Sequence, residues 1–223
     1  MKKLFKEIFE ELISVFTGKS IDILLPPLLF LVLYRLFNLE VALVGSLVLS
    51  IVFFGIRIYH KSNWYYALGG LLGVIFAVAM SYLNNNASDF FLPDIIATVT
   101  LILITVISLL LGKPLAALVS HITRGWDLNW FYRKDVLPAY KEVTIFWLVF
   151  FIVRLTIEVN LYVSGNVDEL VVANIILGLP LTIGVLTVSY IYGIWRLHNL
   201  KGPGVDEFAN NIEPPWRGQN RGF

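Results

Sequence analysis

Cysteine is absent from this 223-residue chain, and charge is scarce: Asp, Glu, Lys and Arg make up 15% of the residues. Without cysteine there are no disulfides, thiolate metal ligands or cysteine nucleophiles. Lys and Arg number 17 against 16 Asp and Glu, so the basic excess typical of nucleic-acid-binding proteins is also missing. The three histidines show neither HxxxH nor HExxH spacing. We therefore predict no metal site, no cofactor and no nucleic-acid partner.

Motifs of common catalytic centres are missing as well. The chain contains no GxSxG nucleophile turn, no GxxxxGK[ST] phosphate loop and no DxxD carboxylate pair. We therefore predict a protein that is not an enzyme.

Apolar residues, in contrast, are abundant. They make up 57% of the chain, and the mean hydropathy is +0.76, whereas soluble domains are about 45–50% apolar. A helix needs about 20 mainly apolar residues to cross a bilayer. The sequence predicts an all-α, polytopic membrane protein with six transmembrane helices at Ile23–Asn38, Val41–Ile58, Tyr65–Leu83, Phe90–Leu111, Val143–Val163 and Leu170–Trp195.

The cations are distributed unevenly about these spans. Of the 17 Lys and Arg residues, 15 lie before the first span, in or at the edge of alternate loops, or after the last span. The three intervening loops hold only acidic charges, such as Asp89 and Asp168. The positive-inside rule therefore predicts that both termini are cytoplasmic.

The chain divides into three predicted parts. Residues 1–20 repeat apolar side chains at helical spacing, which is typical of an amphipathic helix on the inner membrane face or of one packed on the protein's own loops. Residues 21–197 form the six-helix domain. Residues 198–223 are rich in Gly, Pro and Asn and are predicted to be an extended cytoplasmic tail.

The longest loop inside the bundle, Lys113–Lys141, combines aromatic and basic residues. Aromatics alternating with cations bind RNA in some proteins, but between two spans they favour contact with lipid headgroups. We predict a partly inserted loop, with membrane lipids as partners and four interface anchors: Trp126, Trp130, Tyr132 and Arg133.

Two ionisable residues lie within the fifth span. Arg154 and Glu158 are four residues apart, so they share one helix face and can pair. Charges at membrane depth are costly and are candidates for function. One interpretation is a polar site for an ion, an anionic headgroup or protons. The other is a self-neutralising pair that locks the helix to a neighbour.

Arg35 and Asp94 complete the candidate polar site. Arg35 lies near the outer end of the first span, where its side chain can snorkel to the interface or face Glu158. Asp94 follows Pro93 at the start of the fourth span, where the helix dipole favours an acid; the alternative is a ligand within reach of Arg35 or Arg154.

Three stretches carry a resemblance to a known family. They are Leu25–Tyr34, Gly70–Pro93 with its Phe-Phe-Leu-Pro end, and the run from Trp130 through Arg154 to Tyr162. Over residues 22–197 the chain resembles an uncharacterised family of six-span bacterial membrane proteins, a domain of unknown function typical of actinobacteria. A fainter likeness, through Gly112–Leu115 and Asn160–Val163, is to the intracellular septation protein A family.

That resemblance implies a role in the cell envelope without catalysis. We expect a scaffold or accessory subunit of a membrane complex, with a membrane-protein partner or a second copy of the chain. The alternative is a small solute or ion transporter or channel that uses Arg154 and Glu158.

Overall fold

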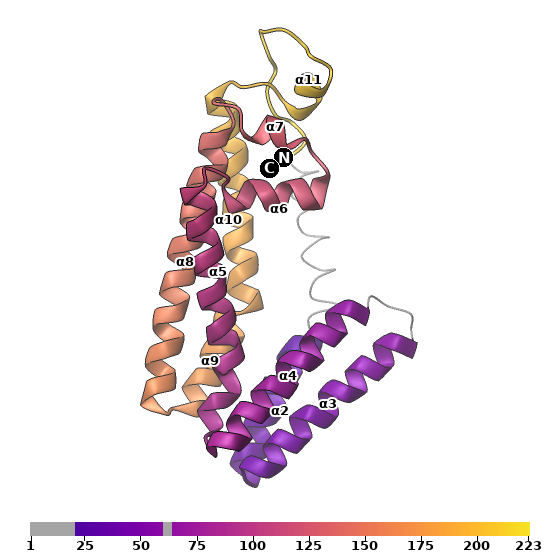
Figure 1. Cartoon of the computed structure of the whole chain (residues 1–223), viewed down its shortest axis with the longest axis vertical. Coiled ribbons are helices and arrows are strands. Elements are labelled where there is room, and N and C mark those ends of the chain that lie inside the picture. Colours follow the sequence, from indigo (N-terminus) through magenta and orange to yellow (C-terminus); the bar gives the residue numbers. More distant parts are fainter. Residues whose placement is uncertain (1–20, 60–63) are drawn as a thin grey trace. The chain divides into compact units, whose positions relative to one another are not determined.

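The structure, a computed structural model, describes residues 21–59 and 64–223. The predicted interfacial helix at 1–20 lies outside the described residues. Every regular element in the described part is a helix, so the all-α prediction is confirmed. In chain order (Figure 1) these are α2 (Ile21–Leu36), α3 (Leu39–Tyr59), α4 (Trp64–Asn84), η1 (Ala87–Phe91), α5 (Leu92–Leu110), α6 (Leu115–Arg124), α7 (Leu128–Phe131), α8 (Leu137–Ser164), α9 (Val167–Leu177), α10 (Leu179–Leu200) and α11 (Val205–Ala209).

Each predicted span coincides with helical structure, but the helices differ in how well they suit a bilayer. Three segments are both long and apolar enough to cross one: Leu39–Tyr59, Ala87–Leu110 and Val167–Leu200. Leu25–Leu36 and Leu68–Asn84 are shorter apolar helices. Helix α8 is 28 residues long and carries Arg154 and Glu158. These helices are consistent with a multi-pass membrane protein.

The last apolar segment is broken in the middle. Helix α9 ends at Leu177, and α10 begins at Leu179 with Pro180 as its second residue. Proline has no N–H to continue a helical ladder, and a Cβ on Gly178 would lie 2.6 Å from the carbonyl oxygen of Asn174. The break therefore follows from this Gly-Leu-Pro sequence.

The described residues form two compact units, and the chain passes between them within α5, within α8 and after Pro180. One unit extends to Ala97 and includes Thr156–Pro180. In it α2, α3 and α4 lie side by side (Figure 1). Its core is aromatic where η1 meets α2, because the ring of Phe30 stacks on that of Phe90 at 4.1 Å and meets Phe91 edge-on.

The turn between α4 and α5 in this unit is organised by one carboxylate. Asp89 is only 2% exposed. Its oxygens accept hydrogen bonds from the Asn84 amide at 2.6 Å, the Asn86 amide at 2.9 Å and the Tyr162 hydroxyl at 2.6 Å. A buried charge is tolerated only when such donors replace water. Asp89 thereby joins the end of α4 to the end of α8.

The second unit comprises Thr98–Leu155 and Leu181–Phe223. Its core gathers where α6, α7 and the start of α8 meet α10 and the tail. The buried residues there are Ala116, Ala117, Trp130, Phe131, Val136, Ala139, Tyr140, Val143, Leu197, Val205 and Phe223. We call this cluster the aromatic cap.

The contribution of the Tyr162–Asp89 hydrogen bond can be tested by removing one hydroxyl group. Tyr162→Phe removes one donor from the buried carboxylate, and we expect the free energy of unfolding to fall by about 2 kcal/mol. The measurement is denaturant unfolding in matched detergent micelles. Tyr82→Phe is the control, since Tyr82 is exposed on α4. Equal stability of both variants would show that the Tyr162–Asp89 hydrogen bond contributes nothing.

Candidate functional site

The two ionisable residues of the fifth predicted span lie in the middle of α8. Glu158 is only 1% exposed, whereas Arg154 is half-buried. A carboxylate removed from water to this degree needs a compensating polar contact. Whether the pair supports the fold or carries a function, Glu158 is the more deeply enclosed member.

Arg35 and Asp94 lie with other partners. The guanidinium of Arg35 forms an ion pair with Asp168, in the first turn of α9; its Nε donates to Oδ1 at 2.8 Å. The amide of Asn174, also on α9, donates to Asp94 at 2.7 Å. The two residues therefore tie α9 to α2 and to α5.

The predicted anchors of the Lys113–Lys141 loop divide into buried and accessible residues. Trp130 is 0% exposed, and its indole N–H donates to the carbonyl oxygen of Pro203 at 2.9 Å. Its ring therefore packs inside the protein and does not meet lipid. Trp126, Tyr132 and Arg133 are half-buried, so part of each side chain stays accessible. The Nε and Nη2 atoms of Arg133 donate to the two carboxylate oxygens of Asp135, at 2.9 and 2.7 Å.

The segment after α10 is folded, which differs from the extended tail that its composition predicts. It turns back through α11 and packs against the aromatic cap. The ring of Phe223 stacks on Tyr140 at 4.2 Å with planes 11° apart. A Cβ on Gly193 would lie 2.2 Å from that ring, so only glycine leaves room for it. Gly-Pro segments can fold when another part of the chain offers an apolar surface.

Three backbone donors converge on one carboxylate within the tail. Glu207 accepts hydrogen bonds from the N–H groups of Gly204 at 2.8 Å, Arg217 at 2.7 Å and Gly218 at 3.1 Å. These bonds, that from Gly204 above all, hold the pKa of the Glu207 carboxyl below its ordinary value. Glu207 thus closes the tail into a loop.

Helices α8 and α10 are joined by an ion pair that the sequence did not suggest. Arg196 donates to both oxygens of Glu142 at 2.8 Å, and the Tyr192 hydroxyl adds a bond at 2.7 Å. Further along the same two helices, the Trp147 indole donates to Ser189 at 2.8 Å. A pairing across 54 positions leaves no periodic signal, so only the fold reveals it.

Tyr140 is the most deeply buried titratable group of the cap. Burial raises the pKa of its hydroxyl far above the ordinary value, although the charge of Arg124 acts in the other direction. Burial also raises the pKa of Tyr132. Both phenols are therefore neutral at physiological pH. In the described part of the chain no cluster of three or more His, Asp or Glu side chains could hold a metal ion.

A known protein family matches most of the chain. Residues 18–197 match the family described as "Protein of unknown function (DUF3159)". The chain belongs to the DUF3159 family. No curated protein and no solved structure gave a significant match.

The DUF3159 match includes Arg154, Glu158 and the whole Lys113–Lys141 loop, and it ends within α10 at Leu197. The folded tail therefore lies beyond the family region yet completes its core, because Val205 and Phe223 pack with Trp130 and Tyr140.

The lowered pKa of Glu207 predicts how the tail of this DUF3159 protein responds to acid. A carboxyl whose pKa is lower in the folded state than in the unfolded state stabilises the fold at pH values above its unfolded-state pKa. That stabilisation is lost as the pH falls through the folded-state pKa. We expect protease cleavage within residues 201–223 to increase below about pH 4.5, where an unfolded glutamate begins to protonate.

Glu207→Gln tests this assignment. The variant cannot ionise, so its tail should be cleaved readily at neutral pH and should lose most of the pH dependence. Glu213→Gln, an exposed glutamate of the same segment, is the control. If Glu207→Gln keeps the wild-type pH profile, Glu207 does not hold the tail.

Proposed function

We propose that this protein is a non-enzymatic scaffold or accessory subunit of a membrane complex in the bacterial cell envelope. It would lie in the inner (plasma) membrane with both termini in the cytoplasm. The observation that carries the proposal is the aromatic cap, a buried cluster that joins the Lys113–Lys141 loop and the start of α8 to α10 and the tail.

The packing of the cap supports the proposed topology. Because the loop and the tail contact each other, as in the Trp130–Pro203 hydrogen bond, they lie on the same side of any membrane that the helices cross. These are also segments that carry cations, among them Arg133, Lys201 and Arg221. The positive-inside rule assigns such a side to the cytoplasm.

One helix of the cap offers a contact surface. Helix α6 turns small residues inward, since Ala116, Ala117 and Ser120 are buried. Its apolar side chains Val119 and Ile122 face outward, and Ile122 is 80% exposed. An outward apolar face beside a folded cap suits a hydrophobic partner in or at the membrane. We propose that this face binds a membrane protein.

The likenesses in the sequence favour the same class of function. Similarity to the intracellular septation protein A family, weak as it is, implies an envelope protein that works through its contacts. We further propose that the DUF3159 relatives of this chain are actinobacterial membrane proteins with the same role.

Gentle extraction of the native membrane, followed by mass spectrometry of the proteins that accompany the chain, tests the scaffold proposal. We expect a defined set of companions. Ile122→Ser should reduce their recovery several-fold, because it places a hydroxyl in the apolar contact. Ile212→Ser is the matched control, an exposed isoleucine on the tail. A chain recovered alone, or equal loss in both variants, would overturn the proposed contact.

Glu158 favours one other candidate, a transporter or channel. A carboxylate that is 1% exposed in the middle of an apolar helix is the kind of group that proton and ion pathways use. In proteoliposomes, Arg154→Ala and Glu158→Gln would then abolish flux of a proton or ion while the protein still folds. Unchanged flux in these variants would end this candidate.

A further inference from the structure

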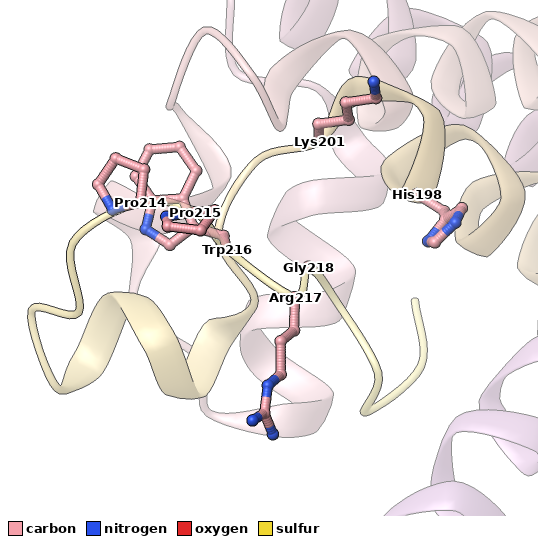
Figure 2. A pocket seen from close by; sticks show the side chains of 7 residues that line it. All are labelled: His198, Lys201, Pro214, Pro215, Trp216, Arg217 and Gly218. Atoms are coloured by element: carbon pink, nitrogen blue, oxygen red, sulfur yellow. The ribbon is translucent and has the colours of Figure 1, made fainter.

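A groove lies where α10 passes into the tail, outside all the sites described above. It has a volume of about 470 Å³ and is lined by His198, Lys201, Pro214, Pro215, Trp216, Arg217 and Gly218. Figure 2 shows the rings of Pro214, Pro215 and Trp216 together on the tail, whereas His198 and Lys201 come from the end of α10 and the residue after it. The groove thus has an apolar wall and a basic border.

Among the described residues, the two long cations of this border lack the salt bridges that three arginines of the same unit form. Arg133, Arg196 and Arg221 form salt bridges with Asp135, Glu142 and Asp206, respectively. Within the described part of the chain, neither Lys201 nor Arg217 forms a salt bridge. Their side chains are exposed, and Figure 2 shows them extending in different directions. The charge of Arg217 also helps to lower the pKa of the nearby Glu207 carboxyl. The two cations leave a positive potential at this border.

The Glu207 carboxylate lies beside the groove, but among the described residues it forms no salt bridge with Lys201 or Arg217. Glu207 accepts the backbone N–H groups of Arg217 and Gly218, so its oxygens are engaged by the main chain. The indole N–H of Trp216 is likewise engaged, since it donates to the carbonyl oxygen of Ile212 at 2.8 Å. Trp216 therefore offers the groove its apolar ring.

The position of the groove indicates where its ligand comes from. The apolar segment Val167–Leu200 ends one residue before Lys201. Near that end Trp195 is 57% exposed, and its ring lies 5.6 Å from that of Tyr192. Exposed aromatic rings at the end of an apolar helix are typical of the membrane interface. Basic pockets at that level bind the phosphates of anionic lipids.

We propose that the groove formed by His198, Lys201, Trp216 and Arg217 binds the phosphate of an anionic phospholipid headgroup. The cations attract the phosphate, and the apolar wall of proline and tryptophan rings covers the glycerol end of the lipid. This inference is independent of the scaffold function, because it requires only the tail and the end of α10.

The test uses the full-length protein, purified and stripped of lipid in detergent. Native mass spectrometry measures binding of phosphatidylglycerol, and phosphatidylcholine with the same acyl chains serves as the zwitterionic comparison. Lys201→Gln with Arg217→Gln should weaken phosphatidylglycerol binding by roughly 20-fold, given the usual contribution of two cations near anionic lipid. The control double variant, Lys134→Gln with Lys141→Gln, removes the same charge from exposed positions outside the groove.

The outcomes separate the possible ligands. Strong preference for phosphatidylglycerol, lost in the groove variant and kept in the control, supports the proposal. Equal binding of both lipids, or equal loss in both double variants, overturns it. If inorganic phosphate binds the lipid-free protein as tightly as phosphatidylglycerol does, the lipid assignment is overturned in favour of a free phosphate. Should the double variant fail to fold, His198→Gln, at an exposed position, takes its place.

Discussion

The constraint on which this structure depends is that polar groups on apolar helices must find partners inside the protein. A bilayer core offers no water, so an unsatisfied donor there is costly. Hydroxyls on these helices bond back to the preceding turn: Ser50 to the carbonyl oxygen of Ser46, Thr105 to that of Leu101 and Ser189 to that of Val185. Such residues can therefore sit within long apolar helices without opening them.

In keeping with the same constraint, two groups of specific tertiary contacts lie near the ends of the helices. In one unit the buried carboxylate of Asp89 gathers donors from α4, the following turn and α8. In the other, the aromatic cap gathers α6, α7, α8 and α10 with the tail. The ion pairs of the cap are partly exposed, so each contributes little. Burial of Trp130, Phe131 and Tyr140 supplies most of its cohesion.

These contacts change how a DUF3159 protein can be understood. The tail lies beyond the matched family region, yet its residues complete the cap, and the Phe223 ring packs closely against Gly193. Surfaces outside the apolar helices, namely the outward face of α6 and the groove at the end of α10, then become places where this protein meets other molecules. Within the helices themselves, Arg154 is a half-buried ionisable residue and Glu158 a buried one.

Sequence alone determined the helical fold and the positions of the apolar helices, because these follow from local composition. It also identified Glu158 as an ionisable group in apolar surroundings. Only the tertiary structure decided that Arg35 pairs with Asp168, that Trp130 is buried and that the tail folds onto the cap. Such pairings join residues far apart in the chain, and their energy appears only when packing brings them together.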